Sequence, residues 1–484
     1  MSISGSLSNA LSGLAAASRM ADVVASNTAN ALTEGYARRE LLLSSQSLGG
    51  NGVGVQIVGI ERITNNTVIQ DLRLATSANT AAEVRTDFYS RIETALGAPE
   101  DASSLVSKVS AFEAALVEAS SRPDSTSRLE GVLRTATAIT DHLKSVSDGI
   151  SAIRMDADQE IQRQVDTLNA SLQQVDQLNA TILAHNSAGR DATALLDQRQ
   201  AIIDQISAIV PVHQQERDNH QVSLYTSGGA ILLEGNPSRI GFSSVGIITP
   251  DMTQQSGALS GLTLNGTPIN SSKGGVLGGG SLGAQFEVRD DLATSAQTQI
   301  DAFARDLIER FQDPAVDPTL NAGDAGLFTD SGVAFSSANE IGIAGRIRIS
   351  SLVNPGLGGD VTRLRDGLGA ITAGDSGDAT LLNAMLDGLT APRQPATGTF
   401  SEGANGSINL AADFLSQIAG NRLSAEDTAS YTAARQSALK ELALADGVDT
   451  DYEMQTLLKV EQMYAANARV IQTIDSLIGQ ILEL

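Results

Sequence analysis

The chain has 484 residues, 42% of them hydrophobic, and a net charge of −24. This length allows several folded domains, and the acidic charge argues against partners that need a basic surface, namely nucleic acid and anionic membranes. Cysteine is absent, which excludes disulfides and thiolate metal sites. We find no stretch long enough to span a membrane and no pattern of a secretory signal, and we therefore expect any export to proceed without a cleaved signal peptide.

The chain opens with a helical pattern. Apolar residues recur there at intervals that place them on one face of a helix, at Ile3, Leu7, Leu11, Leu14 and Val24. A break follows at Glu34-Gly35-Tyr36. Residues 49–60 then alternate apolar and small side chains, which predicts an extended segment.

Further helices are predicted over residues 65–96, 103–120, 128–185 and 192–210. The longest of them carries a heptad seam formed by Ile161, Val165, Leu168, Leu172, Val175, Asn179 and Ile182. Asn179 is the one polar residue in this seam, and such a residue fixes the register of packed helices at some cost in stability. A helix over residues 128–185 would be about 85 Å long, which predicts an elongated helical rod domain.

The pattern changes after residue 221. Short strands and turns are predicted to about residue 283, with a hairpin at Asn265-Gly266. A helix is expected over 284–311, and Ile341, Ile343, Ile347 and Ile349 suggest strands again. Residues 354–406 are rich in Gly, Asp and Thr, with a short helix predicted near 381–389.

The chain ends as it begins. A helical run over 408–445 is separated by Asp446-Gly447 from a terminal helix whose apolar stripe contains Leu458, Tyr464, Ile471, Ile474, Ile478 and Ile481. A helix with one narrow apolar face needs a partner. We expect the two ends to pair as a coiled-coil-like stalk, and a chain of this kind suggests an assembly subunit rather than an enzyme.

The predicted fold is therefore mainly α with inserted antiparallel β. Residues 1–45 and 447–484 are expected to form the terminal coiled-coil assembly domain. The helical rod domain comprises 46–215, 284–312 and 408–446, and the β-rich inserted regions are 216–283 and 313–407. The predicted assembly interface consists of Tyr36 and the apolar residues named above from the two terminal helices.

Two motifs resemble sites of chemistry but lack the required context. Gly278–Gly283 matches a dinucleotide-binding loop, yet it does not follow a buried strand. Ser281 in the same run matches a nucleophile elbow, but every histidine precedes it, whereas that fold places the histidine after the serine. His213, Glu216 and His220 fit a solvated polar connection better than a metal site. We predict no catalytic, cofactor-binding or metal-binding residues.

Both ends resemble the bacterial flagellar rod, hook and hook-associated proteins. The N-terminal resemblance lies in Ser26-Asn27-Thr28-Ala29-Asn30 and in Thr33-Glu34-Gly35-Tyr36-Ala37-Arg38. The C-terminal one lies in Gly447–Met454 and in the run from Tyr464 to Ile471. Leu195-Leu196-Asp197-Gln198-Arg199 and Gly280–Ala284 with Arg289-Asp290 resemble motifs of the hook-associated protein 1 family, the hook–filament junction proteins.

This resemblance implies an extracellular structural subunit of the flagellum that is exported through the flagellar type III apparatus. It implies as partners copies of the same chain, the hook protein, the second hook-associated junction protein and a cytoplasmic export chaperone on the C-terminal region. A hook or distal rod protein is the main alternative, because these proteins share the end motifs. A secreted surface enzyme is a further alternative, which the histidine order disfavours.

Overall fold

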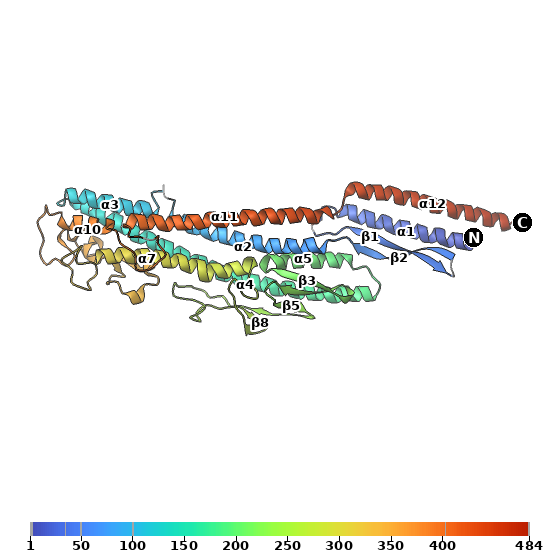
Figure 1. Cartoon of the computed structure of the whole chain (residues 1–484), viewed down its shortest axis with the longest axis horizontal. Coiled ribbons are helices and arrows are strands. Elements are labelled where there is room, and N and C mark those ends of the chain that lie inside the picture. The colour runs from blue at the N-terminus through green and yellow to red at the C-terminus, as the bar shows by residue number, and fades with distance from the viewer. Residues whose placement is uncertain (1–2, 34, 49–50, 99–100, 402, 483–484) are drawn as a thin grey trace. The chain divides into compact units, whose positions relative to one another are not determined.

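The fold is seen in a computed structural model that describes residues 3–33, 35–48, 51–98, 101–401 and 403–482 (Figure 1). Helices dominate and the strands form small antiparallel sheets, which confirms the predicted fold class. Contacts divide the chain into two compact units. The first comprises Met1–Asn79, Asp166–Ile240 and Thr432–Leu484, and the second Thr80–Val165 and Gly241–Tyr431. The predicted division into assembly, rod and inserted domains stays a prediction.

Three long helices contribute residues to both units: α2 (Asn66–Leu96), α4 (Thr126–Ser187) and α11 (Ser407–Ala445). The other helices of the first unit are α1 (Ile3–Ala29), α5 (Thr193–Ile209) and α12 (Thr450–Leu482). Its strands are β1 (Arg39–Leu48), β2 (Asn51–Arg62), β3 (Val212–Arg217), β4 (Gln221–Thr226), β5 (Ile231–Glu234) and β6 (Asn236–Pro237), with β7 (Ile240–Gly241) at its boundary.

The heptad seam of α4 lies where the sequence predicts it. Every member from Ile161 to Ile182 is buried, and Asn179 is the most exposed of them at 8%. The period of about 3.5 residues keeps these side chains on one side of a long helix, where packing excludes water.

Two strands of the first unit differ from the sequence prediction. Residues 39–43 consist of two charged residues followed by three leucines, so their pattern shows no alternation. They nevertheless begin β1, which pairs with β2. The polar run 214–219 was expected to be a solvated connection, but most of it lies in β3, which pairs with the buried β4. A strand at the edge of a sheet needs no apolar face of its own when its backbone is paired.

The second unit contains α3 (Leu105–Ser121), α6 (Gly280–Glu287), a π-helical turn (Val288–Leu292), α7 (Ala293–Phe311), α8 (Ile343–Arg346), α9 (Arg363–Asp366) and α10 (Thr380–Thr390). Its strands are β8 (Thr263–Leu264), β9 (Thr267–Pro268), β10 (Phe328–Asp330) and β11 (Ile347–Ile349). β8 and β9 form the hairpin predicted at Asn265-Gly266. In the described part of residues 313–407 the strands are β10 and β11, which is less strand than the sequence pattern predicts.

Aromatic side chains fill the core of this unit. Phe112 of α3 packs against Phe311 of α7 and Phe328 of β10, each with ring centroids 5.8 Å apart, and the latter two rings are 5.1 Å apart. Such tilted and edge-on pairs stabilise a core beyond the area they bury. All three side chains are at most 1% exposed.

Two predicted boundaries in this unit are wrong. Ile341 and Ile343 were expected in strands, but Gly342 has a positive φ of 76° and starts helix α8. The Asp301 carboxylate accepts hydrogen bonds from the backbone N–H groups of Gly342 and Ala344, at 2.7 and 2.9 Å, which stabilises this helix start. The helix expected from Ala284 begins at Gly280, so Ser281 lies in its first turn.

Candidate assembly surface

The two terminal helices α1 and α12 lie side by side and run in opposite directions (Figure 1). Asn27 of α1 donates a hydrogen bond to Glu453 of α12, and a Cβ on Gly13 would lie only 2.8 Å from the side chain of Asn467. Both contacts belong to one antiparallel register. The predicted pairing of the chain ends is confirmed.

The side chains predicted for an assembly interface fall into three groups. Six are exposed: Ile3, Leu11, Leu458, Tyr464, Ile478 and Ile481. Four are half-buried: Leu7, Leu14, Tyr36 and Ile471. Val24 and Ile474 are buried inside this chain, at 3% and 6% exposure, and hold the helix pair together instead.

The exposed apolar surface of α12 is wider than the predicted stripe. Sequence reasoning missed further exposed apolar side chains, among them Leu457, Met463, Val470, Leu477 and Leu482. Val470 and Leu477 each lie one turn from Ile474, so they widen the predicted face rather than form a separate one. An exposed apolar surface of this extent marks an interaction site.

Asn27 joins α1, β1 and α12. Its Oδ1 accepts from the hydroxyl of Tyr36 at 2.9 Å and from the backbone N–H of Arg39 at 3.0 Å. Its Nδ2 donates to the carbonyl of Arg39 at 2.9 Å and to Oε1 of Glu453 at 3.0 Å. The side chain is 1% exposed, and these four bonds satisfy it completely.

Glu453 begins the contact on α12. Its side chain is buried, and burial raises the pKa of its carboxyl, opposed by the hydrogen bond from Asn27. The neighbouring Arg38 guanidinium lies 5.4 Å from the ring centroid of Tyr452. This end of the helix pair is therefore held by polar contacts, whereas apolar side chains line the rest of it.

Asp197 connects the start of β1 to helix α5. It accepts hydrogen bonds from Arg39 at 2.9 Å and from Arg62 at 2.8 Å, so one carboxylate pairs with both strands of the β1–β2 hairpin. Arg39 also lies over the ring of Tyr36, 4.7 Å from its centroid. The Asp197 motif found in the sequence thus positions the segment that follows α1.

Arg199 of the same motif is buried and links α4, α5 and the turn before β4. It donates to Oδ1 of Asn179 at 2.9 Å and to the carbonyl of His220. Burial, with a smaller effect of nearby Arg62, lowers the pKa of Arg199 to about 10. Asn179 in turn donates to the carbonyl of Val222 at 3.0 Å, which gives the polar seam residue a defined role in register.

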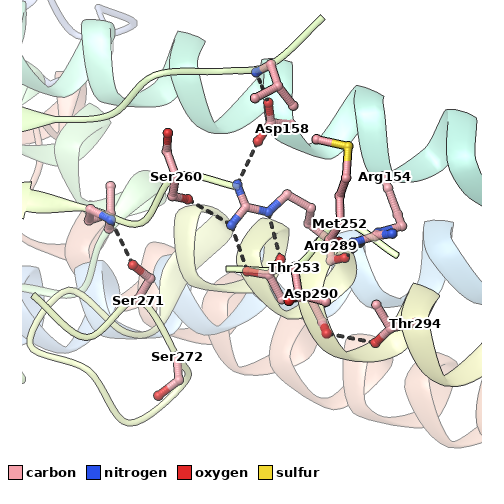
Figure 2. A network of polar contacts seen from close by, with 12 residues as sticks. Arg154, Asp158, Met252, Thr253, Ser260, Ser271, Ser272, Arg289, Asp290 and Thr294 are labelled. Atoms are coloured by element: carbon pink, nitrogen blue, oxygen red, sulfur yellow. Dashed lines mark hydrogen bonds and ion pairs between the residues drawn. The ribbon is translucent and has the colours of Figure 1, made fainter. Parts of the chain in front are cut away.

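In the second unit, Arg289 is the centre of a buried ionic network (Figure 2). Its guanidinium donates to Asp158 at 2.6 Å, to both carboxylate oxygens of Asp290 and to the carbonyl of Ser260 at 3.0 Å. The rings of Phe242 and Phe286 lie within 5.6 Å of it. The Arg289 and Asp158 side chains are both 0% exposed, which makes this pair intolerant of losing either partner.

Arg154 extends this network along α4. It donates to the carbonyls of Arg289 at 2.9 Å, Thr249 at 3.1 Å and Met252 at 2.6 Å. Asp158 also accepts from the backbone N–H of Val245 at 2.7 Å. These contacts attach the segment 242–260 to α4, so the Arg289-Asp290 motif positions a loop.

The residues weighed above as possible metal ligands or nucleophiles make structural hydrogen bonds in the fold. His213 lies in β3, where its ring is hydrogen-bonded to Gln70 and Ser227. Ser281 donates to Gln164 at 3.1 Å. Over the described residues, His, Asp and Glu side chains form no group of three or more that could hold a metal ion, and no helix there is long and apolar enough to cross a bilayer.

Comparison with known proteins finds similarity to flagellar hook-associated and rod proteins. Residues 89–315 match the model of the flagellar hook-associated protein FlgK helical domain, and residues 445–484 match that of the flagellar basal body rod FlgEFG protein C-terminal region. Flagellar hook-associated protein 1 of Bacillus subtilis is 23% identical over 98% of this chain and 97% of its own length. The Escherichia coli protein of the same name is 23% identical over 49% of this chain and 44% of its length.

A solved structure of the flagellar hook junction protein FlgK from Burkholderia pseudomallei covers 54% of this chain and 47% of its own, with a TM-score of 0.45 and 17% identity. The family matches cover the helical middle and the C-terminal helix, and the Bacillus alignment joins them along almost the whole chain. Over these stretches the chain is similar to the flagellar hook-associated protein FlgK family.

Proposed function

We propose that this chain is a structural subunit of the bacterial flagellum that forms the junction between hook and filament. The observation that carries the proposal is the exposed apolar surface of the α1–α12 pair, in a chain whose C-terminal helix matches a flagellar rod-protein family. Apolar side chains left exposed along two paired helices are stabilised when neighbouring subunits cover them. The names of the relatives that match this chain support the place of the subunit in the flagellum.

The proposed partners follow from this role. Copies of the same chain would cover the exposed residues of α1 and α12, with the hook protein on one side of the junction and the second hook-associated protein on the other. We also propose export through the flagellar type III apparatus, with a cytoplasmic chaperone on the C-terminal region. The exposed apolar residues of α12 are the surface that such a chaperone would cover before export.

Immunogold electron microscopy of intact flagella tests the location. A single narrow band of label where the hook meets the filament is the expected result. Label along the hook or in the rod would instead assign the chain to the hook or distal rod proteins. Absence of label from the flagellum would overturn the proposal and reopen other functions, including that of a secreted surface enzyme.

A substitution tests the proposed interface. Leu458 is 57% exposed, so Leu458→Asp should leave the isolated chain folded while placing a charge on the surface that subunits share. Cells carrying this variant in place of the parent are expected to lose the junction band and most filaments. The matched control is Ile231→Asp, which changes a 46% exposed apolar residue of β5 and should assemble normally. Normal junctions with Leu458→Asp would refute the assignment of this surface.

A further inference from the structure

The β1–β2 hairpin has unprotected edges. Its sheet has two strands, so each strand has one edge without a ladder partner in the part of the chain that the structure describes. Residues 41–60, which form most of the hairpin, contain no Asp, Glu, Lys, Arg, His or Pro. Natural proteins protect free strand edges with charges or proline, because an open edge is a template for pairing with another chain.

The hairpin also exposes apolar side chains. Leu42 of β1 is 40% exposed, and Ile57 and Val58 of β2 are 40% and 62% exposed. Other residues of the hairpin pack on α1, where Ser12 accepts a hydrogen bond from the backbone N–H of Val55 at 3.2 Å. A segment that is uncharged, apolar and rich in β-branched residues would promote aggregation if it had no partner in its working state.

A groove runs beside β2. A cavity of about 880 Å³ is lined by residues 57–62 of this strand, by Leu42 of β1, by residues 189–193 between α4 and α5, and by charged side chains that include Arg19, Arg73 and Arg199. All of its lining residues belong to the first unit.

We propose that the β2 edge pairs with the β1 edge of a second copy of this chain, which extends the hairpin into a sheet shared between subunits. This inference rests on the proposed function, since it names one contact of the same assembly. The second copy is the fitting occupant because the hairpin supplies both halves of the contact: two edges of similar length without a ladder partner, neither carrying a charge along residues 41–60. On β2 the N–H of Val55 is already bonded to Ser12, so the free part of this edge lies beyond Val55.

The direction of the strands agrees with this pairing. β1 and β2 are antiparallel within one chain. Copies placed head to tail keep the same orientation, so β1 of one copy is antiparallel to β2 of the next and the alternation continues. A contact between two different surfaces of the same chain repeats from copy to copy and generates a ring or a helical assembly, as a tubular junction requires.

Cysteine cross-linking in assembled flagella tests the pairing, and the parent chain contains no cysteine that would interfere. Cells would co-express Ser44→Cys with one of Val55→Cys, Gln56→Cys or Ile57→Cys, so each chain carries one thiol and every product joins two copies. Treatment of isolated flagella with a short bis-thiol reagent should give dimers at least tenfold more abundant than in a control pair of Ser44→Cys with Ile231→Cys.

The yield should also alternate along the three β2 positions, because successive side chains of a strand point to opposite faces. Equal yields at all three positions, or yields no higher than the control, would overturn the strand pairing. Absence of the parent chain from the flagellum would instead refute the proposed function, so the two failures are distinguishable.

An edge-blocking variant gives an independent readout. Val58→Lys places a charge in the groove at an exposed position, and the purified chain should keep the circular dichroism and melting temperature of the parent. Incorporation into flagella is expected to fall at least tenfold, whereas Ile231→Lys should incorporate normally. Normal incorporation of folded Val58→Lys would overturn the proposal.

Discussion

Changing Asn27 to aspartate tests how the two terminal helices are held together. In the parent, Nδ2 of Asn27 donates to Glu453 at 3.0 Å and to the carbonyl of Arg39 at 2.9 Å. Asn27→Asp replaces the Nδ2 amide group with an oxygen, which then faces the Arg39 carbonyl and the Glu453 carboxylate, both of them acceptors. Two carboxyl groups, that of the substituted side chain and that of Glu453, therefore share one buried site. Like charges at this distance cannot both stay ionised in a buried site.

The magnitude follows from the proton that the pair must take up. Holding a carboxyl of ordinary pKa, about 4.3, in its neutral form costs about 3 to 4 kcal/mol at pH 7 and about 1 kcal/mol at pH 5. Burial already raises the pKa of Glu453, so this group takes the proton. A group with a raised folded pKa contributes most below its unfolded pKa and loses that contribution as the pH rises through the folded value. The variant should therefore weaken the helix contact at pH 7 and largely spare it at pH 5.

Hydrogen exchange measured by mass spectrometry on peptides from 450–464 reports this contact locally. At pH 7 the protection of the first turns of α12 should fall about 500-fold relative to the parent, and at pH 5 less than tenfold. Asn30→Asp is the matched control, because Asn30 directly follows the last residue of the same helix and its side chain donates to the carbonyl of Ser26. An equal loss of protection at both pH values, or the same loss in the control, would refute the reasoning.

Three further substitutions test the other polar contacts. Asp197→Asn should leave two partly buried arginines without a charged partner and lower the stability of the β1–β2 hairpin by about 2 to 3 kcal/mol, measured by hydrogen exchange of residues 53–62. Asp158→Asn should cost about 2 to 3 kcal/mol, since the Arg289 charge stays buried with Asp290 as its remaining carboxylate, and limited proteolysis should then cut within 242–260. Burial raises the pKa of Asp301 to about 6, so its stabilising effect is full near pH 4 and lost above pH 6. The stability advantage of the parent over Asp301→Asn, measured by urea unfolding, should thus shrink by about 2 kcal/mol from pH 4 to pH 7. Unchanged hydrogen-exchange protection would contradict the Asp197 prediction, and an uncut loop the Asp158 prediction. A stability difference that stays constant with pH would contradict the Asp301 prediction.

The helices could be predicted because their pattern is local. Periodic apolar residues marked α2, α3, α4 and α5 to within a few residues of their observed ends, and the turn at Asn265-Gly266 marked a hairpin. The strand β1 could not be found in this way, because its side chains show no alternation and its stability comes from pairing with β2. Ile343 shows the same limit, since a carboxylate from α7 caps the helix in which it lies.

The sequence predicted the candidate assembly surface only in part. The sequence predicted which helix faces are apolar, yet it placed Val24 and Ile474 in the same group as Leu11 and Leu458, although the first two are buried within the chain and the other two are exposed. Periodicity reports which side chains share a face. It does not report how much of that face the partner helix covers.

The sequence by itself determined the helical architecture, the pairing of the chain ends and the motifs that indicate a flagellar subunit, because apolar spacing and motif residues are properties of neighbouring positions. Only the tertiary structure decided what these motif residues do. Asn27 bonds to Glu453 across 426 positions of the chain, and Asp197 bonds to Arg39 across 158. Such contacts depend on the path of the folded backbone, which alone brings these side chains within hydrogen-bond distance.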